Sequence, residues 1–155
     1  MAASIHQRRR ESGTATMELA VALPLLLVTM MATAEFGRMM SQYDALNKAV
    51  RDGARYLAAN ALAAGGTTGV VTITPALTTA TQNLVVKGNT NGTGTALLPN
   101  FVAGNVTVTN LGNGYVSVSA AYQYVPMLGA NLPTFGHGSV NTRLTLNATT
   151  VMRPL

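Results

Sequence analysis

The longest apolar stretch of the chain lies close to its N-terminus. Residues 19–34 carry no charge and are mostly Leu, Ala, Val, Met and Thr. With residues 14–18 they make a segment of about 21 residues, which as a helix rising 1.5 Å per residue matches a bilayer core of roughly 30 Å. The pattern predicts a membrane-spanning helix over residues 14–34.

The helical pattern continues beyond this apolar stretch. Residues 35–64 are rich in Ala, Leu, Met, Lys and Arg, which favour helices. Opposite charges are spaced three or four apart, as in Asp44 and Lys48, which places them on one helix face. Gly65 and Gly66 supply a stop signal, so the helix is expected to run from about Thr14 to Ala64.

Beyond residue 66 the apolar period changes from helical spacing to alternation, as in half-buried strands. Strands are predicted at 106–109 and 115–125, with a third over 140–148, and shorter ones at 70–74 and 84–86. One face of the second strand should be buried, and its members are Val116, Val118, Ala120, Tyr122 and Tyr124. The third run places Val140, Leu144, Leu146 and Ala148 on one parity.

Glycine and asparagine mark the turns between these predicted strands. Gly112-Asn113-Gly114 supplies the positive-φ residues of a tight hairpin turn between the first two strands. Residues 126–138 contain two prolines and several glycines and are predicted to form a loop.

These patterns predict an α+β fold, with one long helix and a small antiparallel β-region on its C-terminal side. Four segments follow: a basic N-terminal segment, 1–13; a membrane-embedded helix, 14–34; the continuation of that helix, 35–64; and a β-rich domain, 65–155. A chain of 155 residues has room for one modest domain beside the helix.

Charge is distributed unevenly along the chain. The formal net charge is +5, but Arg8, Arg9 and Arg10 form one cluster just before the apolar stretch. Basic residues at that position are a topology signal, which keeps this end in the cytoplasm. The basic residues of 35–64 alternate with acids and predict a solvated, paired helix face, so no nucleic-acid partner is expected.

The β-rich part offers little chemistry. All five acids lie at or before Asp52, and the chain has no cysteine, which excludes disulfides and thiolate metal sites. His137 lies between two glycines and is expected to be an exposed loop residue. The sequence therefore predicts no enzyme, no catalytic residue, no metal site and no cofactor.

The junction between the basic segment and the apolar stretch is the most informative motif. A short basic segment ends in Gly13, and Glu18 stands five positions beyond it, directly before the apolar run. This arrangement resembles the prepilin peptidase site of type IV pilins and pseudopilins. The resemblance implies that residues 1–13 are a leader, cut off after Gly13 on the cytoplasmic face, and that Thr14 becomes the new N-terminus.

Glu18 then needs a physical explanation. A carboxylate deep in a membrane helix costs about 2.5–3.5 kcal/mol when it has no partner. Cleavage would create one, the α-ammonium on Thr14 of a neighbouring subunit, and such a pair would fix how neighbouring helices are staggered. The alternative is that Glu18 sits at the membrane edge in water.

Three further segments extend the resemblance to the TadE-like proteins of tight-adherence pilus systems: residues 23–27, 35–38 and 49–56. It covers roughly residues 8–60, with one departure at Leu19, where such proteins usually have an aromatic residue. The resemblance implies a non-catalytic structural subunit in the bacterial inner membrane. Its C-terminal domain would be periplasmic, and its partners would be other pilin-like subunits, the prepilin peptidase, an inner-membrane assembly platform and membrane lipid.

Pro24 interrupts the predicted membrane helix. A proline costs a soluble helix about 3 kcal/mol, but membrane bundles tolerate it where neighbours satisfy the freed carbonyl. Similar prolines recur in pilin helices, so Pro24 is interpreted as a kink or a melted turn. A neutral bend in an ordinary anchor is the alternative.

A secretory signal peptide is the rival interpretation of the N-terminal segment. Ala32-Thr33-Ala34 is an A-x-A sequence that follows an apolar core and a basic region. Cleavage after Ala34 would release a secreted β-rich protein that begins at Glu35. The apolar core is slightly long for such a signal, and residues 35–56 continue the same helix pattern.

Overall fold

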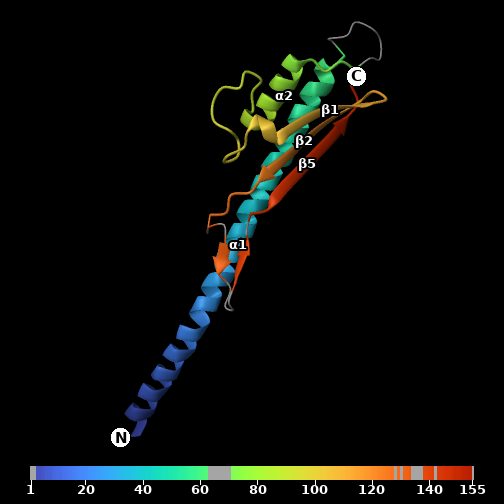
Figure 1. The fold of residues 1–155 in the computed structure, drawn as a ribbon. Helices are drawn as coiled ribbons and strands as arrows, with labels where there is room; N and C mark the ends of the chain where they lie inside the picture. Colours follow the sequence, from blue (N-terminus) through green and yellow to red (C-terminus); the bar gives the residue numbers. More distant parts are fainter. Residues whose placement is uncertain are drawn as a thin grey trace. The chain divides into compact units, whose positions relative to one another are not determined.

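The computed structural model describes residues 3–62, 71–127, 129, 131–133, 138–141 and 143–154. The chain has the predicted α+β architecture, with a long N-terminal helix, a second helix and antiparallel strands (Figure 1). It divides into two compact units, Met1–Arg38 and Met39–Leu155. The elements are α1 (Ala3–Asn60), α2 (Pro75–Lys87), the 3-10 helix η1 (Ala103–Asn105), β1 (Val106–Gly112), β2 (Tyr115–Gln123), β3 (Asn131–Pro133), β4 (Ser139–Asn141) and β5 (Thr145–Met152).

The first unit consists of the N-terminal part of α1. Residues 14–34 are helical throughout, as the apolar pattern predicts, and Pro24 lies inside the helix. Because proline has no backbone N–H, the carbonyl of Ala20 cannot accept the usual helical hydrogen bond from residue 24. Side chains from residue 13 to residue 34 are exposed.

The second unit begins with the C-terminal part of α1, which buries one face. Its buried apolar residues recur every three or four positions, as in an amphipathic helix: Leu46, Ala49, Val50, Ala54, Leu57 and Ala58. The helix ends at Asn60, where residues 61 and 62 form a turn. The predicted end at Ala64 and the stop signal at Gly65 and Gly66 lie outside the described residues.

Helix α2 corrects the sequence prediction of a strand at 84–86. Thr74 caps the helix, since its side chain accepts a hydrogen bond from the backbone N–H of Leu77 over 3.2 Å. Pro75 opens the first turn, where a missing N–H costs nothing. Gly88 closes the helix in the left-handed region, with φ of 75° and its N–H bonded to Leu84.

Three strands form one antiparallel sheet in the order β1-β2-β5. Strands β1 and β2 are joined by Asn113 and Gly114, whose φ angles of 52° and 77° suit a tight hairpin turn, as predicted. The predicted buried face of β2 is confirmed, because its five members are between 0% and 3% exposed. On the other parity, Ala121 and Gln123 are exposed, Ser119 is half-buried and Ser117 is buried.

The region after β2 differs from the prediction. Residues 131–133 and 139–141 pair as β3 and β4, where the sequence predicted a loop up to residue 138. The predicted strand over 140–148 is split between β4 and β5, which belong to different sheets. The split follows from the length of β2, which ends at Gln123 opposite Thr145 and leaves β5 no partner strand further along. Residues 71–74 form no strand, and Val70 lies outside the described residues.

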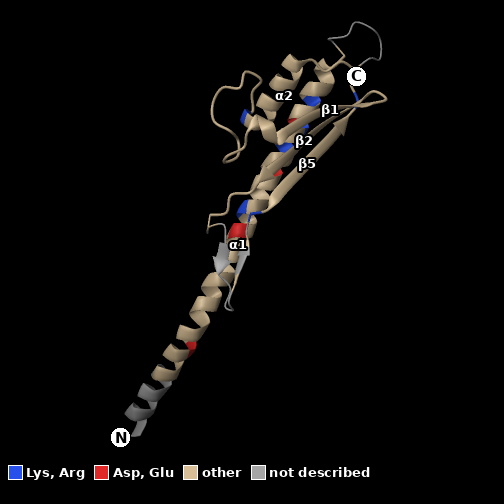
Figure 2. Cartoon of the chain, in the orientation of Figure 1, with Lys and Arg blue, Asp and Glu red and all other residues tan. Residues whose placement is uncertain are grey.

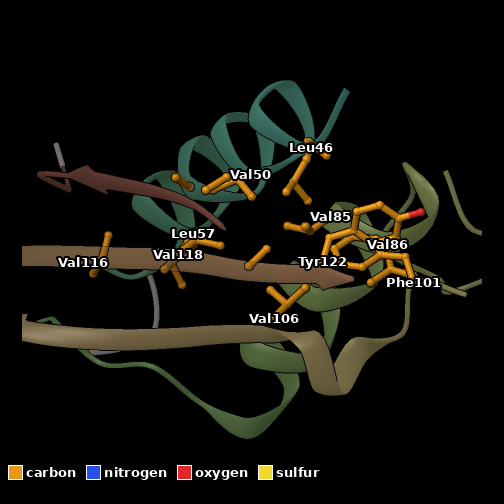
Figure 3. Packing of buried hydrophobic residues seen from close by; sticks show 14 of the residues in the cluster. Leu46, Val50, Leu57, Val85, Val86, Phe101, Val106, Val116, Val118 and Tyr122 are labelled. Carbon is orange, nitrogen blue, oxygen red and sulfur yellow. The ribbon is translucent and has the colours of Figure 1, made fainter. Parts of the chain in front are cut away.

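The hydrophobic core of the second unit lies where α1, α2 and β2 face one another (Figure 3). Tyr122 reaches from β2 to the ring of Phe101 in an edge-to-face contact, with centroids 5.7 Å apart at 86°. Its hydroxyl donates a hydrogen bond to the side-chain oxygen of Gln42 on α1, over 3.1 Å. The sheet is therefore joined to the second half of α1 by both apolar packing and a polar contact.

Candidate assembly helix

The residues predicted to carry function lie together on the N-terminal part of α1. Thr14 and Glu18 are four positions apart, so the helix places them on one face, one turn from each other. Both are exposed. The nitrogen of Thr14 is a peptide N–H in the uncut chain, and only cleavage would convert it to an ammonium. Pro24 follows about two turns after Glu18.

The backbone around Gly13 is open. A Cβ atom placed on Gly13 would meet no atom within 4 Å outside its own helix backbone and chain neighbours. No described neighbour therefore obstructs approach of another protein to the peptide bond between Gly13 and Thr14.

The apolar side chains of this part of α1 point outward without a covering partner from the described chain. Eight of its large apolar residues are at least 48% exposed: Met17, Leu19, Val21, Leu25, Leu26, Leu27, Val28 and Met30. Within Gly13–Asn60 the most apolar 18-residue window has a mean hydropathy of 1.9 and is unburied. Large exposed apolar surfaces mark sites that contact protein or membrane, and the helix is long and apolar enough to cross a membrane.

Two polar side chains inside the apolar segment are satisfied by the helix itself. The hydroxyl of Thr29 donates to the carbonyl of Leu26 over 2.9 Å, and that of Thr33 donates to the carbonyl of Thr29 over 2.8 Å. These bonds lower the cost of placing hydroxyls in an apolar layer. Sequence reasoning missed them, although threonine in an apolar helix commonly bonds back to the preceding turn.

Glu18 is the one charged residue between positions 13 and 34. Figure 2 shows the acidic and basic positions along the described part of α1. No intrahelical basic residue stands three or four positions away, because Thr14, Ala15, Val21 and Ala22 occupy those positions. A cation that neutralises Glu18 in an apolar layer would have to come from outside this helix segment.

The described residues of the second unit contain no cluster of metal-ligating side chains. In the described ranges no group of three or more His, Cys, Asp or Glu side chains could hold a metal ion. His137 lies outside those ranges. The features that sequence analysis selected thus concentrate on α1.

Comparison with known proteins also selects helix α1. A family model described as TadE-like protein matches residues 13–55. The matched segment contains Gly13, Thr14, Glu18 and Pro24 and runs without a break through Ala34. No curated protein and no solved structure matches the chain. The chain therefore carries a TadE-like protein family domain at residues 13–55.

Proposed function

We propose that this chain is a pilin-like structural subunit of a tight-adherence pilus or of its assembly machinery. The observation that carries the proposal is the uncovered apolar surface of α1 inside the TadE-like domain. That surface needs lipid before assembly and protein neighbours after it, and a pilin helix meets both in turn. The role is structural and needs no catalytic residue.

The proposal assigns a location to each part of the chain. The arginine cluster of residues 8–10 stays in the cytoplasm, and residues 14–34 cross the inner membrane once. The second unit then lies in the periplasm or on an extracellular pilus. The partners are other pilin-like subunits, the inner-membrane assembly platform and membrane lipid.

Processing by the prepilin peptidase after Gly13 completes the proposed mechanism. The cut exposes an α-ammonium on Thr14, which pairs with Glu18 of a neighbouring subunit. A charge-assisted hydrogen bond in an apolar layer is strong, and removing one member of such a buried pair costs about 3–5 kcal/mol. The pair therefore selects one axial stagger of the packed helices.

Pro24 has a part in the same proposal. The carbonyl of Ala20, which lacks its helical donor, lets the helix kink or locally melt where neighbouring helices pack. Hydroxyls and waters in a bundle can satisfy that carbonyl, so the cost of the proline in the assembly is small.

The signal-peptide alternative fits the matched segment less well. Cleavage after Ala34 would divide residues 13–55 near the middle and discard the part with the exposed apolar side chains. Helix α1 also continues through residues 32–35. Both observations favour a helix that is retained in the mature protein.

Cysteine cross-linking tests the proposal, because the chain has no cysteine of its own. Val21→Cys places a thiol at a 79% exposed position of the apolar segment. In cells that produce the pilus system, a reagent with one maleimide and one photoreactive group, attached to this thiol and then illuminated, should join the variant to another pilin-like subunit in the membrane fraction. Thr107→Cys, an exposed position on β1, serves as the control for labelling efficiency. A soluble chain that begins at Glu35 would contradict the proposal.

A further inference from the structure

The second unit contains a shallow hollow between α1 and the end of β5. Its volume is about 510 Å³, and it is lined by Arg55, Ala58, Ala59, Met152 and Arg153. The two arginines bring guanidinium groups from positions 98 residues apart in the sequence. Alanine and methionine provide an apolar floor. Figure 2 shows basic positions both along α1 and at the C-terminal end of β5.

The backbone that carries both arginines is fixed by buried neighbours. Arg55 is exposed but stands between Ala54 and Leu57, each 0% exposed. Arg153 is exposed too, and it is flanked by Met152, which pairs with Val116 in the sheet, and by the buried Pro154. A preorganised site loses less entropy when a ligand binds.

Few acidic side chains of this chain can neutralise these two guanidinium groups. No Asp or Glu follows Asp52 in the sequence, so an Asp or Glu side chain of the same chain that pairs with these arginines would come from α1. Asp52 stands three positions before Arg55 on the exposed side of the helix, and a pair at that spacing contributes only about 0.2–0.5 kcal/mol. A carboxylate that contacts both arginines at once would compete easily with a pair of that strength, because hydrogen bonds to charged groups contribute about 1.5–3 kcal/mol.

We propose that this hollow binds an acidic side chain of a neighbouring pilin-like subunit. The carboxylate lies between Arg55 and Arg153, whose planar guanidinium groups suit two-pronged contacts. Its methylene groups pack against Ala58 and Met152. The inference rests on the proposed function for the class of partner and adds the surface that this partner uses outside the membrane-spanning segment.

The shape of the site favours a protein side chain over lipid headgroups. Headgroups attract projecting polybasic segments, whereas this site is concave and has an apolar floor. A glutamate or aspartate side chain supplies both the charge and the aliphatic carbon that such a floor accepts.

Zero-length cross-linking tests the site in the full chain, in membranes that contain the pilus system. Arg153→Lys keeps the charge and introduces an amine, which a carbodiimide couples to a carboxylate in contact with it. The expected product joins this position to an Asp or Glu of another pilin-like subunit. Arg51→Lys is the matched control, an exposed arginine one turn earlier on α1 than Arg55, and it should give several-fold less product. A product confined to Asp52 of the same chain, or none, would overturn the proposal.

A second variant tests the site without requiring the lysine amine of Arg153→Lys to reach the bound carboxylate. Arg55→Glu combined with Arg153→Glu should lower recovery of the chain in complexes with pilin-like subunits by roughly tenfold or more, the ratio expected for loss of charged hydrogen bonds. Recovery equal to the wild type would count against the site. If the Val21→Cys cross-links persist while both tests of the hollow fail, the hollow is wrong and the proposed function stands.

The membrane alternative has its own readout. With Arg153→Cys reconstituted in vesicles without pilin partners, labelling by an impermeant maleimide should be equal in phosphatidylcholine and in phosphatidylcholine with phosphatidylglycerol. Protection that depends on phosphatidylglycerol would assign the hollow to lipid and overturn the proposal.

Discussion

Gly53 on α1 faces Val85 on α2 so closely that a Cβ atom on Gly53 would lie 2.3 Å from Cγ2 of Val85. Val85 is fully buried, and the carbonyl oxygen of Thr81 lies 3.8 Å from the same Cβ position. A side chain at position 53 would therefore force the two helices or the Val85 rotamer to move. The glycine sets how closely α2 packs on the second half of α1.

Gly53→Ala is expected to destabilise the second unit. Overpacking typically costs about 1–3 kcal/mol, and the better helix propensity of alanine recovers up to about 1 kcal/mol. With a recovery of about 1 kcal/mol the net loss should be roughly 0–2 kcal/mol, measured as thermal or urea unfolding of the full chain in detergent. Gly37→Ala is the matched control, since nothing lies within 4 Å of its Cβ position, and it should be neutral or slightly stabilising. Equal stability of Gly53→Ala and Gly37→Ala would refute the close packing.

Tyr122→Phe removes the hydroxyl that donates to Gln42 and keeps the ring that packs on Phe101. A hydrogen bond of this kind contributes about 0.5–1.5 kcal/mol. The free energy of unfolding, measured by urea denaturation, should therefore fall by that amount. Tyr115→Phe, at a 45% exposed position of the same strand, should change little. A Tyr122→Phe variant as stable as Tyr115→Phe would show that the bond to α1 adds no stability.

Thr74→Ala tests the cap of α2. Loss of the bond to the N–H of Leu77 should cost about 1 kcal/mol and speed hydrogen exchange in the first turns of α2. Thr79→Ala is a suitable control, because Thr79 is on the same helix and bonds only to the carbonyl of the preceding turn. Unchanged exchange in Thr74→Ala would argue against the capping role.

The sequence predicted the elements whose patterns are local and regular. The strict alternation from Val116 to Tyr124 and the Asn113-Gly114 turn are short-range signals, and both were confirmed. The long apolar run likewise predicted the helix over residues 14–34, although α1 begins earlier, at Ala3. Each of these elements is specified by a pattern within its own segment and does not depend on contact with another part of the chain.

Helix α2 was missed because its composition favours strands. Threonines and the pair Val85-Val86 have low helix propensity, and burial against α1 and β2 outweighs that preference. The helix boundaries were nevertheless encoded, by the Thr74-Pro75 start and the Gly88 end. Weighting these boundary signals above β-propensity would have found the helix.

The two candidate sites also differ in whether a local sequence pattern or a long-range contact defines them. Gly13 and Glu18 are selected by spacing within a few residues and by resemblance. Arg55 and Arg153 come together only because β5 pairs with β2, which packs on α1. A long-range relation of that kind leaves no pattern in a single sequence.

Glu18→Gln separates processing from assembly. In the proposed mechanism the peptidase acts before any Thr14 ammonium exists, so the variant should lose its leader normally. It should also insert slightly more easily, because an amide costs less than a carboxylate in an apolar layer. Incorporation should fall sharply, since an unpaired buried ammonium costs roughly 3–5 kcal/mol. Glu35→Gln makes the same chemical change beyond the apolar run and should assemble much better.

Two measurements are needed for that comparison: the mass of the membrane-bound chain and its cross-linking to partner pilins. Normal incorporation of processed Glu18→Gln would reject the ion-pair mechanism and leave the pilin assignment intact.

The mass of the mature N-terminus tests the central claim most directly. The chain should be purified from membranes of cells that contain the prepilin peptidase, beside a Gly13→Val variant whose β-branched residue should block the cut. The proposed function predicts a wild-type chain that begins at Thr14 and a Gly13→Val chain that keeps its leader. A wild-type chain that begins at Glu35 would contradict the account, and so would efficient cleavage of Gly13→Val at the same bond.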